Sequence, residues 1–175
     1  MQIGDKEFEV LLTEEQIASA VSKMSRAISK DYQSKDVVLL SVLNGAFIFT
    51  ADLIREIDIN VEVTFVKVRS YEGTASSGKV RELIGLEAEL KGRHVLLVED
   101  IVDSGYTINY LLDMLKAQEP ASIHIATLLF KPDALKVTVD LKYVGVNIPN
   151  RFVVGYGLDY NGLGRQYREV YQLKA

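Results

Sequence analysis

The apolar residues of this chain follow two alternating patterns, which together predict alternating strands and helices. Largely apolar runs, typical of strands buried on both faces of a sheet, occur at residues 37–43 and 95–98, and further strands are predicted at the apolar-rich residues 61–68 and 123–130. Segments with apolar residues at helical spacing lie before and between these runs, at residues 13–28, 46–57 and 107–115. This order predicts an α/β fold with an open, mostly parallel, twisted sheet that is flanked by helices.

Local signals mark where several of these segments begin and end. Thr13 and Gln16 have the spacing of a capping box, and Asn44-Gly45 predicts a turn after the first buried strand. Residues 72–78 have no periodicity and few large apolar groups, so they predict a flexible loop that is long enough to form a lid. The last third of the chain is predicted to hold short strands at residues 144–146 and 152–154 and an edge strand at Tyr167–Leu173.

Length and composition narrow the class of protein. The chain has 175 residues, 48% apolar and 25% charged, so one globular domain over residues 1–175 is expected. A net charge of −4 argues against an electrostatic surface for nucleic acid or an acidic membrane. The absence of cysteine excludes disulfides, zinc fingers and thiol nucleophiles. With neither a signal peptide nor an apolar run near the roughly 18 residues of a spanning helix, a soluble cytoplasmic protein is expected.

The strongest functional signal is the segment Val95–Thr107, where four apolar residues lead into Glu99, Asp100 and Asp103. A short loop then opens the next helix, so the unit is predicted to be a strand, an acidic loop and a helix. Backbone amides at such a helix start bind anions, but three carboxylates would repel a phosphate unless sugar hydroxyls or a metal ion lay between. The predicted ligand is therefore a phosphorylated ribose with a Mg²⁺-bound diphosphate. The structural alternative is an ordinary turn whose acidic residues cap the helix.

This string resembles the phosphoribosyl diphosphate-binding motif of the type I phosphoribosyltransferases, and its Glu-Asp start with Asp103 is most similar to the hypoxanthine-guanine branch. The resemblance implies the fold of that family, in which a small hood subdomain and a flexible lid loop accompany the main sheet. It also implies purine salvage by Mg²⁺-dependent transfer of the 5-phosphoribosyl group to N9 of hypoxanthine or guanine. Asp103 would act as the general base at purine N7. The residues of the string expected to bind phosphoribosyl diphosphate are Glu99, Asp100, Asp103, Ser104, Gly105, Tyr106 and Thr107.

Further motifs of the family follow in order along the chain. Leu43-Asn44-Gly45 is similar to the loop that binds diphosphate, in which the first peptide bond can be cis. Lys67 lies two residues before Arg69, so on a strand both would point to one face and could meet the diphosphate. Arg165 is similar to a family arginine that contacts the leaving diphosphate, and Ser70-Tyr71 is similar to the pair that closes the lid over the site.

The resemblance also assigns a purine site. Lys131 would donate a hydrogen bond to the 6-oxo group, Phe152 would stack on the base, and the backbone of Val153 would read the base edge. Asp159 would lie near the exocyclic group or at a second Mg²⁺, so the expected metal ligands are Glu99, Asp100 and Asp159. Without the resemblance, the pattern alone would place Phe152 and Val153 in the core.

Alternatives stay open at this level. An enzyme with the same fold could prefer xanthine or adenine, although Lys131 fits a 6-oxopurine and argues against adenine. A non-catalytic regulator could sense nucleotides and bind nucleic acid, but Asp103 and the acidic net charge oppose it. A flavodoxin-like phosphate-binding module would leave Phe152–Asp159 without a role. The expected partners are therefore small-molecule substrates and neither nucleic acid nor membrane, and the resemblance implies a homodimer or homotetramer.

Overall fold

The computed structural model describes residues 1–70, 80–86 and 88–174. The predicted lid at residues 72–78 and Tyr71 lie outside the described residues, as do the side chains of Arg69 and Ser70. The elements, in chain order, are β1 (Gln2–Ile3), β2 (Lys6–Leu12), α1 (Glu14–Asp31), β3 (Val37–Leu43), α2 (Phe47–Glu56), β4 (Glu62–Ser70), β5 (Val80–Ile84), β6 (His94–Val102), α3 (Tyr106–Lys116), β7 (Ser122–Phe130), the 3₁₀ turn η1 (Pro132–Ala134), β8 (Tyr143–Asn147), β9 (Val153–Val154) and β10 (Val170–Leu173).

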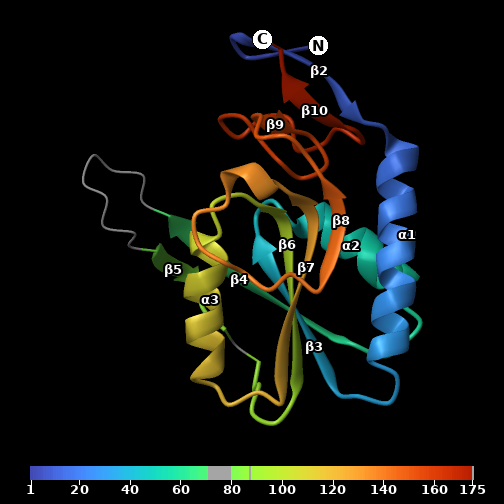
Figure 1. The fold of residues 1–175 in the computed structure, drawn as a ribbon, viewed down its shortest axis with the longest axis vertical. Coiled ribbons are helices and arrows are strands. Elements are labelled where there is room, and N and C mark those ends of the chain that lie inside the picture. The colour runs from blue at the N-terminus through green and yellow to red at the C-terminus, as the bar shows by residue number, and fades with distance from the viewer. Residues whose placement is uncertain (71–79, 87, 175) are drawn as a thin grey trace.

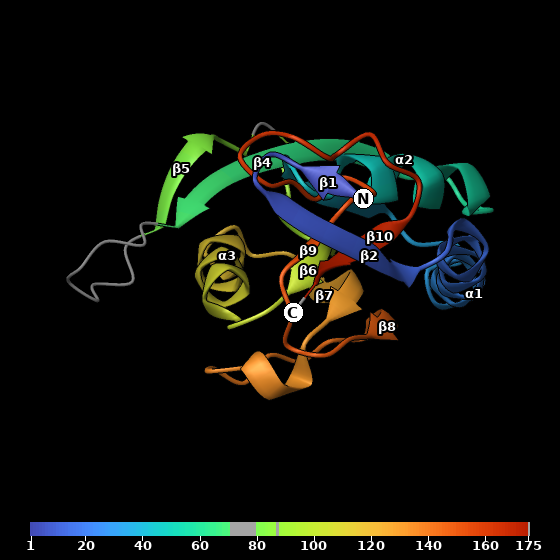
Figure 2. The same ribbon diagram turned by 90° about the horizontal axis from the view of Figure 1, so that it is seen from above.

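The main sheet has the strand order β5-β4-β3-β6-β7-β8, and all neighbours are parallel except the antiparallel edge pair β4–β5. Helices α1 and α2 lie on one side of it and α3 on the other (Figures 1 and 2). The predicted open, mostly parallel sheet with flanking helices is confirmed. Because β3 and β6 are central, the two loops with the strongest motifs leave the sheet side by side.

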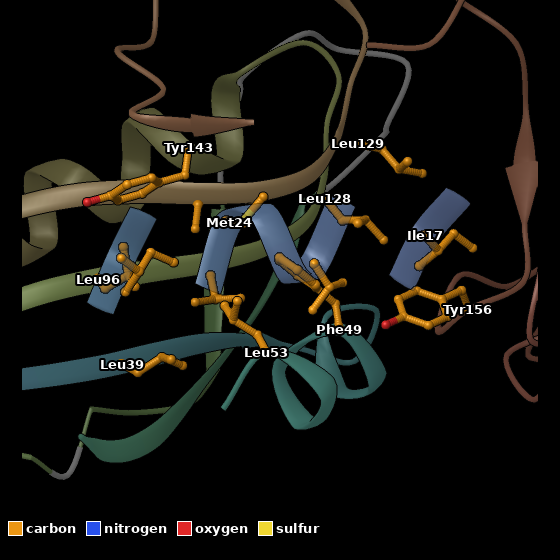
Figure 3. Close-up of a cluster of buried hydrophobic side chains, with 14 of the residues drawn as sticks. Ile17, Met24, Leu39, Phe49, Leu53, Leu96, Leu128, Leu129, Tyr143 and Tyr156 are labelled. Atoms are coloured by element: carbon orange, nitrogen blue, oxygen red, sulfur yellow. The ribbon is translucent and has the colours of Figure 1, made fainter. Parts of the chain in front are cut away.

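Each face of the sheet has its own apolar core. On one face, Leu39 and Leu96 pack with α1, α2 and Tyr143 of β8 (Figure 3). On the other, Val38 and Leu97 pack against the apolar side of α3. Successive strand residues alternate between these cores, which is why the central strands are continuously apolar. The capping box predicted at Thr13 is present and starts α1.

A second, smaller sheet covers the carboxyl end of the main one, with the order β1-β2-β10-β9 (Figure 1). Phe8, Ile3 and Val154 form its core. It corresponds to the hood that the resemblance implied. The predicted edge strand at Tyr167–Leu173 was wrong in two respects: β10 begins at Val170, and it lies between β2 and β9. Its partner β2 is more than 150 positions away in sequence, and a local pattern does not reveal such a pairing.

Candidate active site

A cavity of about 460 Å³ opens where β3, β6 and β7 end, beneath the second sheet. Carboxyl ends of parallel strands are the usual ligand-binding edge of such sheets. The predicted residues that line it are Leu43, Gly45, Glu99, Asp100, Asp103, Thr107, Lys131, Phe152, Val153, Asp159 and Arg165. The structure therefore brings together residues from three separate predicted motifs.

Glu99 and Asp100 form an acidic pair on β6 at the floor of this cavity. Glu99 is buried, and its Oε2 atom has no hydrogen-bond partner among the described residues. Burial, and then the charge of Asp100, raise the pKa of Glu99 well above its ordinary value of 4.5. Burial also raises the pKa of Asp100, although the amide of Ile101 donates a hydrogen bond of 2.6 Å to its Oδ1 atom. Two adjacent buried carboxylates with raised pKa values favour a ligand that supplies hydroxyl donors or positive charge.

The Leu43–Gly45 loop lies directly against this acidic pair. The Leu43–Asn44 peptide bond is cis, as the resemblance allowed. A Cβ atom at Gly45 would overlap Oδ2 of Asp100, and a Cβ atom at Gly157 would overlap the carbonyl oxygen of Gly45. Both glycines are needed because the Leu43–Gly45 loop fits between a carboxylate and another backbone.

The loop between β6 and α3 is shaped by Gly105, which caps α3 in the left-handed conformation with φ of 86°. The amides of Lys136 and Val137 donate hydrogen bonds to the carbonyl of Ser104, at 3.0 and 3.2 Å, and hold the loop from behind. The N-cap Gly105 makes no side-chain cap, and among the described residues the hydrogen bond of the Asp103 side chain is to Lys131, so Asp103 is not the cap that the structural alternative required. The first-turn amides of α3 have no intrahelical partner, and amides in this position can bind an anion. Of Ser104–Thr107, Thr107 lines the cavity.

Asp103 and Lys131 form an ion pair at the end of neighbouring strands, with 2.8 Å between Nζ of Lys131 and Oδ2 of Asp103. The lysine side chain is 8% exposed, whereas the aspartate is 50% exposed. Both side chains line the cavity, the aspartate more exposed than the lysine. A lone lysine at the end of a strand is usually solvated, but the structure buries this one.

Phe152 lies beside the cavity with 46% of its surface exposed. Its ring contacts those of Phe8 and Tyr160, with centroids 6.4 and 5.9 Å apart. Phe152 is therefore not the core residue that its apolar neighbours suggested, because nearly half of its surface is exposed at the cavity. Val153 is buried in β9.

Arg165 and Asp159 close the far side of the cavity. Nη2 of Arg165 lies 2.6 Å from Oδ1 of Asp159, and Nη1 donates a hydrogen bond of 2.5 Å to the carbonyl of Gly157. Oδ2 of Asp159 accepts a further bond from the amide of Gly162. These bonds fix the Asp159 carboxylate from both sides.

The phosphoribosyl transferase domain family matches this chain over residues 8–161. The chain belongs to the phosphoribosyltransferase family. A hypoxanthine-guanine phosphoribosyltransferase of Dictyostelium discoideum is 43% identical over 167 residues, which cover 93% of this chain and 91% of the relative. One from Mycobacterium avium is 46% identical over 168 residues, with coverage of 92% and 81%.

Solved structures agree with the family and the fold. A hypoxanthine phosphoribosyltransferase from Staphylococcus aureus superposes with a TM-score of 0.92 at 40% identity, covering 97% of this chain and 92% of that one. No helix in the described part of this phosphoribosyltransferase is both long and apolar enough to cross a membrane.

The predicted metal ligands Glu99, Asp100 and Asp159 all line this cavity of the phosphoribosyltransferase. Glu99 and Asp100 are adjacent on β6, whereas Asp159 lies across the cavity and is paired with Arg165. Within residues 1–70, 80–86 and 88–174, no group of three Asp, Glu, His or Cys side chains is placed around one metal position. The assignment of Glu99 and Asp100 to one ion and of Asp159 to a second stays a prediction.

Other predicted residues lie outside the cavity lining. Lys67 pairs with Leu43 across β3 and β4 and so lies beside the Leu43–Gly45 loop, but its neighbour Val68 lines the cavity instead. Asn44 is exposed, and Ser104, Gly105 and Tyr106 shape the loop next to the lining. The apolar lining residues that the sequence did not reveal are Val42, Val68, Ile101 and Leu158. Their apolar character does not distinguish them from core positions.

Proposed function

We propose that this phosphoribosyltransferase acts in purine salvage and transfers the 5-phosphoribosyl group of 5-phosphoribosyl 1-diphosphate to N9 of hypoxanthine or guanine. One observation carries the proposal: a single cavity joins the acidic pair Glu99–Asp100, the Asp103–Lys131 ion pair and the exposed ring of Phe152. The hypoxanthine-guanine enzymes that share over 40% of its residues support the choice of purine.

The acidic pair and the helix start bind opposite ends of the phosphorylated sugar. The 5-phosphate lies against the first-turn amides of α3 and the hydroxyl of Thr107. The ribose hydroxyls donate hydrogen bonds to Glu99 and Asp100, which gives the partnerless Oε2 atom of Glu99 a donor. The diphosphate extends toward the Leu43–Gly45 loop and Arg165.

The purine binds between Phe152 and the Asp103–Lys131 pair. Phe152 stacks on the base, and the backbone of Val153 reads its edge. The ammonium group of Lys131 only donates hydrogen bonds, so it matches the accepting 6-oxo group of hypoxanthine and guanine. Adenine presents an amino group at the same position, and two donors would then face each other.

In the reaction, the bond between C1 and the diphosphate oxygen breaks while the bond from purine N9 to C1 forms, with inversion at C1. The bond electrons leave with the diphosphate, and the N7 proton of the base passes to the Asp103 carboxylate. Asp103 is half-exposed toward the cavity, where a base must be, and Lys131 holds it in place.

The acidic pair also fits a Mg²⁺ ion. Such ions are held by one or two carboxylates together with substrate phosphates, so Glu99 and Asp100 are sufficient without a third carboxylate. The buried Oε2 atom of Glu99, which has no hydrogen-bond partner in the described part of the chain, is what a cation would satisfy. Bound with the diphosphate, Mg²⁺ supplies charge neutralisation for the leaving group. The proposal also includes a cytoplasmic location and, by analogy with the family, assembly as a homodimer or homotetramer.

Product identification tests this function. The purified protein is incubated with hypoxanthine, 5-phosphoribosyl 1-diphosphate and Mg²⁺, and the products are separated and weighed by mass spectrometry. We expect inosine monophosphate and diphosphate in equal amounts, and no product after the metal is chelated. Release of free ribose 5-phosphate without any nucleotide would contradict the proposal.

A further inference from the structure

Three consecutive residues in the purine-binding segment have a left-handed backbone. Gly155, Tyr156 and Gly157 have φ angles of 94°, 49° and 99°. Glycine adopts this conformation freely, but a tyrosine does so rarely and only where surrounding contacts hold it. The amide of Tyr156 donates to the carbonyl of Tyr167 at 2.8 Å, and the amide of Gly157 to that of Arg165 at 3.0 Å.

This run brings the proposed purine-binding segment, residues 152–159, into contact with the Leu43–Gly45 loop, which is the proposed diphosphate loop. A Cβ atom on Gly157 would overlap the carbonyl oxygen of Gly45, and one on Gly155 would overlap the carbonyl of Glu169. Arg165 then bonds both the carbonyl of Gly157 and the carboxylate of Asp159. A small rotation of the run would therefore move the purine-binding residues relative to the loop proposed to hold the leaving group.

The side chain of Tyr156 anchors the Gly155–Gly157 run to the apolar core and to α2. It is 7% exposed and reaches the apolar cluster next to Ile17 and Phe49 (Figure 3). Its hydroxyl donates a hydrogen bond of 2.6 Å to Oδ2 of Asp52 on α2. Since α2 starts two residues after Gly45, Asp52 moves with the diphosphate loop. The bond joins the two loops across 104 positions of sequence.

We propose that Tyr156 and Asp52 are positioning residues for the transfer reaction: their hydrogen bond sets the purine-binding segment against the diphosphate loop, so that N9 meets C1 in line with the leaving group. This inference rests on the proposed function. Neither side chain lines the substrate cavity, so each acts through the backbone at Gly157 and Gly45. Positioning errors of this kind lower turnover and raise KM without removing any catalytic group.

The chain offers a matched control. Tyr143 is also 7% exposed and belongs to the same apolar cluster, at its opposite end (Figure 3). Its hydroxyl donates a bond of 2.8 Å to Oδ2 of Asp31, far from the substrate cavity. Tyr143→Phe therefore reports what the loss of a buried tyrosine–aspartate hydrogen bond does to stability alone.

The experiment measures kcat, the KM of hypoxanthine and of 5-phosphoribosyl 1-diphosphate, and Tm for Tyr156→Phe, Asp52→Ala, their double variant, Asp52→Asn and Tyr143→Phe. Tyr156→Phe and Asp52→Ala should each lower kcat/KM for hypoxanthine about five-fold, and the double variant no further. Asp52→Asn keeps an accepting oxygen and should recover most of the loss. Tyr143→Phe should lower Tm by a similar amount and leave the kinetic constants unchanged.

Two results would overturn the inference. One is that Tyr156→Phe lowers Tm while its kinetic constants match those of the unaltered protein. The other is that the effects of Tyr156→Phe and Asp52→Ala on kcat/KM add fully in the double variant. Asp52 is partly exposed on α2, so its variants carry the same test if Tyr156→Phe does not fold. An unaltered protein that forms no nucleotide would overturn the proposed function, and the inference with it.

Discussion

Nζ of Lys131 lies 2.8 Å from Oδ2 of Asp103, and this pair joins the ends of β6 and β7 in the lining of the substrate cavity. In the proposed mechanism one partner holds the purine oxygen and the other takes the purine proton. Because they are already in contact, a purine that meets both is oriented with its 6-oxo and N7 side toward them. The two side chains should therefore respond differently to substitution, even though they touch.

Asp103→Asn should bind 5-phosphoribosyl 1-diphosphate normally and lose most of its turnover. Asparagine keeps the shape of the side chain but accepts no proton, and loss of a general base lowers rates by about 10²–10⁴. Steady-state kinetics give kcat, and calorimetric titration gives the dissociation constant of the diphosphate substrate. Unchanged turnover would remove Asp103 from the mechanism.

Lys131→Met should raise the KM of hypoxanthine by about ten-fold to a hundred-fold, the loss expected for a charged hydrogen bond. Affinity for 5-phosphoribosyl 1-diphosphate should change much less, since Lys131 lies on the purine side. Lys116→Met provides the control, because that lysine pairs with Asp113 on an exposed face of α3. An equal effect of Lys131→Met on both substrates would contradict the assignment of Lys131 to the purine.

Gly45→Ala should weaken binding of 5-phosphoribosyl 1-diphosphate severely. The added methyl group would overlap Oδ2 of Asp100, so either the acidic pair or the diphosphate loop must move. Gly92→Ala is the comparison, because a Cβ atom there meets nothing within 4 Å although φ is +72°. Gly92→Ala should cost stability through its backbone and leave substrate affinity intact. Matching affinities in the two variants would show that the close approach of Gly45 and Asp100 is unimportant.

Glu99→Gln should stabilise the substrate-free protein at pH 8 while it weakens binding of the diphosphate substrate. Burial raises the pKa of Glu99 above its ordinary 4.5, so the folded state binds the proton more tightly than the unfolded one. Its contribution to the free energy of unfolding is therefore favourable at low pH and lost as the pH rises through the raised pKa.

Glutamine carries no charge and avoids this loss. We expect Tm to rise by about 2–4 °C at pH 8, the shift that 1 kcal/mol produces in a chain of this size, and no gain at pH 4. Thermal melts without metal or substrate provide the measurement. A fall in Tm of the same size at both pH values would mean that the ionised Glu99 carboxylate does not destabilise the folded protein.

Much of the main sheet could be predicted because its central strands are buried on both faces. Residues 37–43 and 123–130 have the apolar pattern of buried strands and fit no other simple interpretation. Because β6 and β7 are neighbours in the sheet, Asp103 and Lys131 at their ends lie close together. In the second sheet, strands were predicted near β9 and β10, but β1, β2 and the pairing of the strands were not. The physical reason is that β2 pairs with β10 at the opposite end of the chain, and a local pattern does not reveal such a partner.

The candidate site also contains residues that the sequence could predict and residues that it could not. The acidic pair and the α3 loop are contiguous in sequence, and their chemistry could be derived from residue types. Phe152 could not be placed by its apolar neighbours, since its exposure depends on packing against Phe8 from β2. The bond between Tyr156 and Asp52 and the lining roles of Ile101 and Leu158 depend on tertiary contacts that only the fold creates.

The base specificity of the transfer tests the central claim most directly. Diphosphate release is measured with hypoxanthine, guanine, xanthine and adenine in turn, each with 5-phosphoribosyl 1-diphosphate and Mg²⁺. A site in which Lys131 donates to a 6-oxo group predicts turnover with hypoxanthine and guanine and the lowest kcat/KM for adenine. Preferred turnover of adenine, or none with any of the four bases, would contradict the account.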